Sequence, residues 1–350
     1  MRLLLALGIT VGLLNSIGAS AQAGKCKFVL IVDWQVRMVR NQIVVDGAIS
    51  GQKIGIVLDT GAQSSLILRS SAARLGLSTK EVRGRRMIGV GGESQIEIAT
   101  VDDFKLGEVS TKDMQLYVSG EREFTDGTDV LLGENFLRNF DVEFDLKNHA
   151  VRLYQARDCE GVTLAYWTKE VVGEVEIKPV EELRPVISFK VHVNDRPFDA
   201  ILDSGASTSV FSQDDAASLG VTPETPGVVA GAPARGLGAK AVSMWTGTFK
   251  SFAIGNEDIP DIRIRFADLF KDATYAETGS RITRRSAHAQ PMLLGADFLL
   301  AHRMLVAHSQ RKLYFTYAGG PVFRVDALPP APAARPAGGV DAKSGGAAPP

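Results

Sequence analysis

The sequence predicts an all-β protein built from two similar lobes in tandem, each a small β-barrel with short helices. Two observations support this. The chain repeats itself, because residues 56–65 (IVLDTGAQSS) align with residues 200–209 (AILDSGASTS). In each copy, runs of β-branched and aromatic residues are separated by turn residues, which is typical of paired strands.

Further landmarks keep the same order in both copies. AARLG at 72–76 corresponds to AASLG at 216–220, and LG at 106–107 to IG at 254–255. VLLGENFL at 130–137 corresponds to MLLGADFL at 292–299. Several landmarks in one order identify a tandem duplication.

The N-terminal residues predict a signal peptide over 1–23. Arg2 precedes an apolar run at 3–14, and Ala21-Gln22-Ala23 fits the small-residue rule for cleavage. A membrane anchor is the alternative, but the run is shorter than the roughly 20 residues that a spanning helix needs. We therefore expect a periplasmic or secreted protein with no stable membrane insertion after cleavage.

Within each copy, a hairpin comes first. Residues 43–45 and 53–58 flank the turn-rich pairs Asp46-Gly47 and Ser50-Gly51, and residues 186–193 and 198–202 flank a turn at 194–197. Short helices are predicted at 70–75 and 213–219, each stopped by a glycine. Residues 150–154 and 312–317 are predicted to be closing strands, and 161–183 a connection that adds strands between the lobes.

These elements divide the chain into predicted regions. After the signal peptide come an N-terminal lobe at 24–160, a connection at 161–183, a C-terminal lobe at 184–322 and a disordered tail at 323–350. The tail is Pro, Ala and Gly with little else, too few apolar groups to offset the entropy of ordering. An insertion at 267–291, which includes the basic run 281–285, has no counterpart in the first copy and is interpreted as a solvated loop.

Charge, histidine spacing and cysteine content limit the partners, cofactors and cross-links that we expect for the chain. The 39 Lys and Arg nearly balance 40 Asp and Glu, so nothing indicates a nucleic-acid partner. The five histidines show no metal-ligand spacing, so neither a metal nor another cofactor is expected. Cys26 and Cys159 are the only cysteines, and in an oxidising compartment they are predicted to form a disulfide across the first lobe, with two free thiols as the alternative.

The candidate chemistry lies in the two repeated turns. Asp59 and Asp203 each follow an apolar strand and precede a hydroxyl residue and a glycine, which places a carboxylate at the end of a buried strand. One Asp-Thr-Gly unit is an ordinary turn, but two at equivalent repeat positions predict a paired site. The predicted active-site loops contain Thr60, Gly61, Ala62, Ser204, Gly205 and Ala206.

On these motifs the chain resembles the retropepsin-like aspartic proteases of bacteria, here joined in tandem like the lobes of pepsin. The resemblance covers residues 40–157 and 184–318. It implies a bilobal fold with a central cleft, and hydrogen bonds of Thr60 and Ser204 across the lobe interface. It also implies that Leu132, Gly133, Leu294 and Gly295 support the loops from behind. Glycine-rich hairpin tips would form flaps at Gly89, Val90, Gly91 and Gly92 and at Gly236, Leu237 and Gly238.

The resemblance also implies a mechanism. Two carboxylates in contact share one proton, so the ionised member activates a water and the protonated member donates to the peptide carbonyl. Ala62 and Ala206 lack the hydroxyl of the pepsin-type turn that could donate to each carboxylate, which predicts dyad pKa values higher than those of pepsin and activity extending toward mildly acidic or near-neutral pH. The expected substrate is a polypeptide bound as an extended strand.

Two alternatives remain open at this stage. A non-catalytic peptide-binding or scaffold protein could retain the fold, and the second copy does depart from the first at Ala296-Asp297 and at 301–303. Alternatively, each lobe could pair with a lobe of another chain. Because linkage of over 20 residues gives the two lobes a high effective concentration, a monomer with intramolecular pairing is expected.

Overall fold

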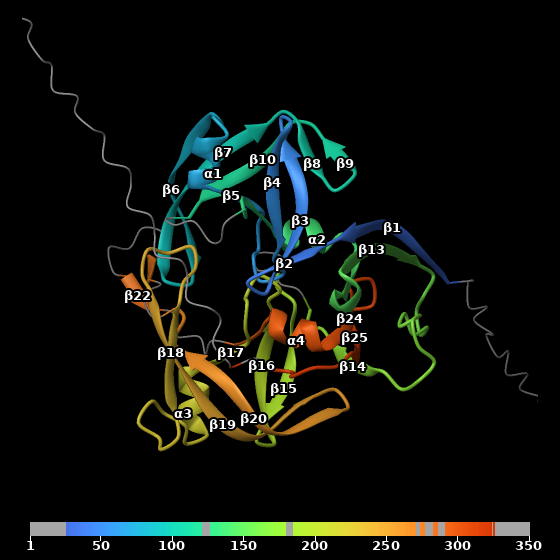
Figure 1. Ribbon diagram of the computed structural model, residues 1–350, viewed down its shortest axis with the longest axis vertical. Coiled ribbons are helices and arrows are strands. Elements are labelled where there is room, and N and C mark those ends of the chain that lie inside the picture. The colour runs from blue at the N-terminus through green and yellow to red at the C-terminus, as the bar shows by residue number, and fades with distance from the viewer. Residues whose placement is uncertain are drawn as a thin grey trace, which may run out of the picture.

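The computed structural model describes residues 26–120, 127–179, 185–270, 274–276, 283–285, 291–323 and 325. The predicted signal peptide, nearly all of the predicted tail and most of the 267–291 insertion lie outside the described residues. Across the described residues the protein is almost entirely β, as predicted (Figure 1). None of the described helices is long and apolar enough to cross a membrane.

The first lobe, in blue to green at the top of Figure 1, is one ten-stranded sheet with two short helices. Its main strand order is β6-β7-β10-β5-β11-β4-β3-β8-β9, and β2 pairs with β3. The strands are β2 (Arg37–Val39), β3 (Gln42–Ile49), β4 (Gln52–Leu58), β5 (Leu66–Leu68), β6 (Thr79–Gly89), β7 (Gly92–Val101), β8 (Phe104–Leu106), β9 (Val109–Thr111), β10 (Met114–Ser119) and β11 (Val130–Leu132). The helices are α1 (Arg69–Arg74) and α2 (Glu134–Leu137).

The second lobe, in yellow to orange at the bottom of Figure 1, is a seven-stranded sheet in the order β15-β16-β23-β17-β20-β19-β18. Pairing of β15 with β19 closes six of these strands into a barrel, as predicted. The strands are β15 (Ser188–Val193), β16 (Arg196–Leu202), β17 (Val210–Ser212), β18 (Val229–Ala234), β19 (Val242–Ile254), β20 (Glu257–Ala267) and β23 (Met292–Leu294). The helices are α3 (Gln213–Ser218) and α4 (Ala296–Ala301), and a separate hairpin pairs β21 (Thr274–Ala276) with β22 (Thr283–Arg285).

A third sheet joins the lobes, in the order β1-β13-β12-β24-β25-β14. Its strands are β1 (Lys27–Gln35), β12 (Asp141–Asp145), β13 (Ala150–Arg157), β14 (Gly173–Glu176), β24 (His302–Ala307) and β25 (Lys312–Tyr317), with a 3-10 turn η1 (Leu146–Asn148) between β12 and β13. The predicted strands at 150–154 and 312–317 are therefore present, but they belong to this shared sheet and do not close separate lobes. The connection contributes β14, as expected.

The predicted hairpins are present, but both turns are shorter than predicted, since Arg196 and Pro197 of the predicted 194–197 turn already pair with β15 as part of β16. The β3–β4 turn is at Ser50-Gly51 alone, where both residues have positive φ, whereas Asp46-Gly47 lies inside β3 opposite β4. Gly47 pairs with Ile54 on β4 and Leu106 on β8, and position 47 requires glycine because a Cβ there would collide with the carbonyl oxygen of Lys105. In the second lobe, Asn194 and Asp195 adopt the left-handed turn that suits the twist of a two-residue hairpin.

One apolar core runs through both lobes and the shared sheet. Its fully buried members include Ile56 and Leu58 on β4, Leu202 on β16 and Phe144 on β12. The last residues of the two strands that carry the repeated aspartates, Leu58 and Leu202, are fully buried in this core, which holds the strand ends in place.

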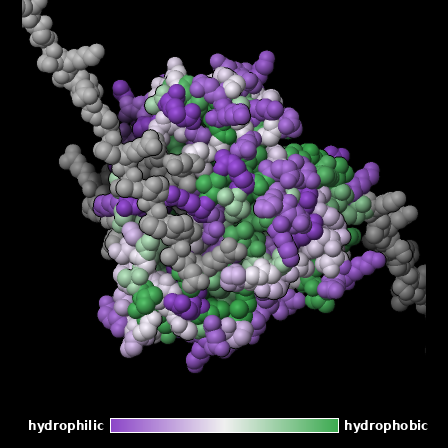
Figure 2. Space-filling view, in the orientation of Figure 1, coloured by the Kyte–Doolittle hydropathy of each residue, from purple (hydrophilic) through white to green (hydrophobic). Residues whose placement is uncertain are grey.

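A face of the molecule is shown in Figure 2. Hydrophilic side chains cover most of it, and one hydrophobic area lies at the right, where β1 and β13 are placed in Figure 1. Val29, Leu30 and Ile31 on β1 are about half exposed.

Candidate active site

Asp59 and Asp203 occupy matching positions directly after β4 and β16. The main-chain N–H groups of Gly61 and Ala62 both donate to Asp59 Oδ1, at 3.0 Å. Those of Gly205 and Ala206 donate to Asp203 Oδ1, at 3.1 and 2.9 Å. Each tight turn therefore fixes one carboxyl oxygen through its backbone, which leaves the second oxygen for the partner carboxyl or a ligand.

The structure brings the two carboxyl groups together across the lobe boundary, near enough for each to affect the pKa of the other. A side chain at Gly61 would collide with the Asp203 carboxyl, and one at Gly205 with that of Asp59. Glycine after the hydroxyl residue is thus required on both sides, because each loop packs directly on the other lobe's carboxylate.

Burial raises the pKa of both aspartates, and the negative charge of Asp203 raises that of Asp59 further. The backbone donors oppose this shift without cancelling it. Because two carboxylates in contact resist double ionisation, the pair retains one proton to a higher pH than a free carboxyl group would.

The hydrogen bonds expected for Thr60 and Ser204 are present, and both residues are fully buried. Thr60 Oγ1 donates to Leu202 O at 2.8 Å and accepts from Ser204 N at 2.9 Å. Ser204 Oγ donates to Leu58 O at 2.7 Å and accepts from Thr60 N at 3.0 Å. These four reciprocal bonds clamp the loops across the lobe interface and explain why a hydroxyl residue follows each aspartate.

The Leu-Leu-Gly elements lie behind the loops, where the resemblance places them. β11 pairs in parallel with β4, and β23 with β16. Leu132 O accepts from Asp59 N at 3.0 Å, and Leu294 O accepts from Asp203 N at 2.9 Å. The carbonyl of each leucine therefore anchors the backbone of one aspartate.

A second hydroxyl network was not foreseen from the sequence. Ser65 Oγ accepts from Gly133 N and donates to Asn135 Oδ1, at 3.0 and 2.8 Å. In the second lobe, Ser209 Oγ accepts from Gly295 N and donates to Asp297 Oδ1, at 2.9 and 2.7 Å.

The signal was available, because each serine lies six residues after its aspartate and each partner lies two residues after the glycine of its Leu-Leu-Gly element. Asn135 and Asp297 were compared only as a departure between the copies. In the structure, each accepts from its serine through one Oδ1 atom, so they make the same contact.

The two predicted flaps meet at their tips, although they lie almost 150 residues apart in sequence. The β6–β7 hairpin ends at Val90-Gly91, and residues 235–241 connect β18 to β19. Gly238 N donates to Val90 O and Lys240 N to Gly91 O, both at 3.1 Å. Lys240 was not singled out from the sequence, since the contact involves only its main chain.

Each flap tip also contacts the apolar surface of the opposite lobe. Leu237 packs against a first-lobe apolar cluster that includes Leu66 and Leu131. Val90 packs against a second-lobe apolar cluster that includes Val210 and Leu293. The loops of the two copies thus meet at the lobe boundary, and so do the flap tips.

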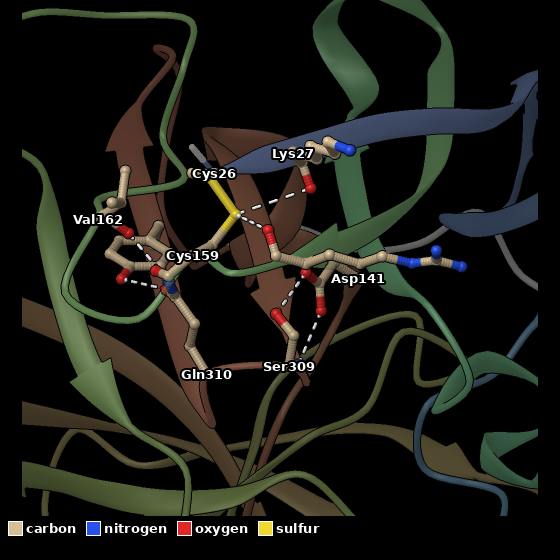
Figure 3. The surroundings of a disulfide bond; sticks show 9 residues. Cys26, Lys27, Asp141, Cys159, Val162, Ser309 and Gln310 are labelled. Atoms are coloured by element: carbon tan, nitrogen blue, oxygen red, sulfur yellow. Dashed lines mark hydrogen bonds between the residues drawn. A yellow bond between two sulfur atoms is a disulfide. The ribbon is translucent and has the colours of Figure 1, made fainter. Parts of the chain in front are cut away.

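The predicted disulfide between Cys26 and Cys159 is present. It ties the residue before β1 to the end of β13, and Figure 3 shows it beside the β24–β25 turn. There Gln310 donates to Cys159 O and to Val162 O. The disulfide therefore lies in the shared sheet, on the side of the first lobe.

In the described part of the chain, no group of three or more His, Cys, Asp or Glu side chains is arranged to hold a metal ion.

Two matched lobes, each presenting an aspartate at the end of a buried strand, define the two-lobed aspartic protease architecture. Comparisons with protein families agree. A model described as gag-polyprotein putative aspartyl protease matches residues 45–139, and one described as aspartyl protease matches residues 189–298. The chain belongs to the retropepsin-like aspartic proteases and carries two of these domains in tandem.

No curated protein matches the chain at a significant level. Among solved structures, a similar one is described as the crystal structure of aspartic proteinase from Irpex lacteus. It covers 82% of this chain and 97% of its own, at 13% sequence identity and a TM-score of 0.47.

Proposed function

We propose that the protein is an exported aspartic endopeptidase in which Asp59 and Asp203 form the catalytic dyad. The observation that carries the proposal is the contact of two carboxyl groups, each held by two backbone N–H groups and both with raised pKa values. Neither loop has a second acidic side chain that could replace its aspartate.

The proposed mechanism needs one proton on the pair. The ionised member accepts a proton from a bound water, and that water attacks the peptide carbonyl carbon. The protonated member donates to the carbonyl oxygen, and the resulting tetrahedral diol collapses as a proton passes to the leaving amine. Because the pair titrates as a unit, neither aspartate is assigned the proton in advance.

The substrate would lie as an extended strand between the dyad and the flap tips. Backbone groups of the flaps would pair with the peptide, and the apolar side chains next to Leu237 and Val90 would contact its side chains. Because the flap tips bond to each other, they must separate before a peptide can enter.

Export and a monomeric state belong to the same proposal. The Cys26–Cys159 disulfide fits an oxidising compartment, and one chain supplies both aspartates.

The test compares the purified wild type with Asp59→Asn and Asp203→Asn on a diverse peptide mixture between pH 3 and 8. Each substitution should lower kcat by about 10³-fold, the scale of lost general acid–base catalysis. Asp258→Asn, at an exposed position on β20, is the matched control and should cleave like the wild type. Cleavage that survives in both dyad variants would reject the assignment, and a wild type that binds peptides without cleaving them would favour the binding-protein alternative.

A further inference from the structure

The two lobes differ in the side chain that directly follows the Leu-Leu-Gly element. It is Glu134 in the first lobe and Ala296 in the second. The main chain is alike, because Glu134 N donates to Ala62 O and Ala296 N donates to Ala206 O, both at 2.8 Å. The first lobe therefore holds an additional carboxyl group beside its active-site loop.

The Glu134 side chain is buried, with 2% of its surface exposed, yet its bonding is incomplete. Oε1 has no hydrogen-bond partner among the described residues, and Oε2 lies 3.7 Å from Nε2 of His308. That ring nitrogen is also buried without a hydrogen-bond partner in the described structure. Unpaired buried polar atoms are costly. The carboxyl group of Glu134 and the ring nitrogen of His308 each contain one, and they lie 3.7 Å apart at their nearest atoms, so a hydrogen bond between them would reduce this cost.

His308 is held firmly from the other lobe. It begins the turn between β24 and β25, and its neighbour Ser309 donates to Asp141 through both N and Oγ, at 2.8 and 2.6 Å (Figure 3). Glu134 lies at the start of α2, so the pair spans the junction between the first lobe and the strands that the second lobe adds to the shared sheet.

The charged and titratable groups around the pair come from several elements. The negative charge of Asp59, in the active-site loop, affects the pKa of Glu134. The positive charge of Arg138, at the end of α2, affects the pKa values of both Glu134 and His308. The cavity that His308 lines is also bordered by Asp141, Tyr154 and Arg157.

Burial and the charge of Asp59 raise the pKa of Glu134 to about 8, although Arg138 opposes the shift. Burial and Arg138 lower the pKa of His308 to about 4. Between these values Glu134 is protonated and His308 is a neutral imidazole. The tautomer with its proton on Nδ1 leaves Nε2 as an acceptor for the Glu134 hydroxyl.

We propose that Glu134 and His308 share one proton in a buried O–H···N hydrogen bond that joins the lobes and stabilises the support of the Asp59 loop. The importance of this support for catalysis rests on the proposed role of Asp59, whereas the shared proton between Glu134 and His308 does not. A side-chain adjustment of about 1 Å brings the two atoms to hydrogen-bond distance and satisfies His308 Nε2. The pair is then neutral and adds no charge beside Asp59.

The dependence on pH follows from the two pKa values. Glu134 binds its proton more tightly in the folded chain, so its contribution is complete below about pH 4.5 and is lost as pH rises through about 8. His308 binds its proton less tightly, so its contribution is complete above about pH 6.5 and is lost as pH falls through about 4. Between 4.5 and 6.5 the folded and unfolded pairs each hold one proton, which predicts a stability plateau.

The test measures denaturant-induced unfolding of the full chain from pH 4.5 to 8, in an Asp203→Asn background to prevent self-cleavage. Glu134→Gln keeps the shape and an N–H donor for His308 but cannot titrate. The folding constant of the Glu134-containing chain, divided by that of Glu134→Gln, should fall about tenfold per pH unit over this range. Glu108→Gln, whose side chain is almost fully exposed, is the control and should give a constant ratio.

A ratio for Glu134→Gln that does not change with pH would overturn the proposal, because it would mean that folding moves no proton onto Glu134. If that variant does not fold, His308→Gln provides the second measurement. The corresponding ratio should then fall about tenfold per unit as pH decreases from 6.5 to 4, and a flat profile would also overturn the proposal. Neither measurement depends on peptide cleavage, so both can be interpreted even if the dyad assignment is wrong.

Discussion

The two lobes build nearly identical active-site loops on sheets that differ at their edges. In the second lobe, β19 runs without interruption through 13 residues and bends back to pair with β15. In the first lobe the same path is divided into β7 and β8, with Asp102 and Asp103 between them, and β8 pairs with β3. The loops nevertheless keep matching hydrogen bonds around Asp59 and Asp203.

This difference shows which parts of the duplication are constrained. The loops contact each other, so a change in one must suit the other, and their bonds are made mostly by the main chain. The break between β7 and β8 lies away from the two loops and leaves their hydrogen bonds unchanged. The exceptions are Glu134 and the disulfide, which the first lobe alone has and which both adjoin the shared sheet.

The largest effect expected in a test of this equivalence is from Gly133→Ala and Gly295→Ala. A Cβ at Gly133 would lie 2.6 Å from Ala62 O, and one at Gly295 would lie 2.6 Å from the Thr208 carbonyl carbon. Because main-chain atoms cannot move away easily, each change should cost about 3 kcal/mol or more and abolish cleavage. Thermal unfolding and peptide cleavage measure this, and Gly231→Ala, which has space for a Cβ, is the control.

Loss of stability in only one of these glycine variants would show that the two lobes are not equivalent at this position. It would mean that the support behind one dyad member is more tolerant than the support behind the other.

A smaller effect is expected for the element that only the first lobe has. Cys26→Ser with Cys159→Ser opens a loop whose ends are 133 residues apart, and should lower the free energy of unfolding by roughly 2–3 kcal/mol. Cleavage at low temperature should persist, since the dyad does not contact the disulfide. Denaturant titration of the double variant, beside reduced wild type, measures the loss. Equal stability of the bonded and unbonded chains would show that β1 is held by pairing with β13 alone.

The smallest effect concerns the pH profile of cleavage. Ala62→Ser or Ala206→Ser would add a hydroxyl that can donate to the neighbouring carboxylate, favour its ionised form and lower the pKa of the dyad. The acid limb of kcat/KM should then move to lower pH, similarly for both variants. Ala62→Gly, which adds no donor, is the control. A shift in one lobe alone would show that the two carboxyl groups are not equivalent toward the added donor.

Much of the fold could be predicted because the two copies carry the same local sequence patterns. The hairpins, the short helices ended by Gly76 and Gly220, and the strands that precede Asp59 and Asp203 all follow from local patterns. The turn at Asp46-Gly47 was misplaced, because a favourable turn pair was overridden by pairing of β3 with β4 and β8. The strands at 150–154 and 312–317 were predicted, but their shared sheet was not, because strand partners depend on long-range packing.

The surroundings of Asp59 and Asp203 show the same contrast between features that local sequence predicts and features that depend on long-range packing. The residue pattern alone is enough to place Asp, a hydroxyl residue and Gly at the end of a buried strand in each lobe, since backbone conformation and burial depend largely on a short segment. The resemblance also implied the hydrogen bonds of Thr60 and Ser204 across the lobe interface. The meeting of the flap tips and the position of Glu134 beside His308 emerged only from the folded chain. Those contacts join residues about 140 or more positions apart, and only the packing of the three sheets brings them together.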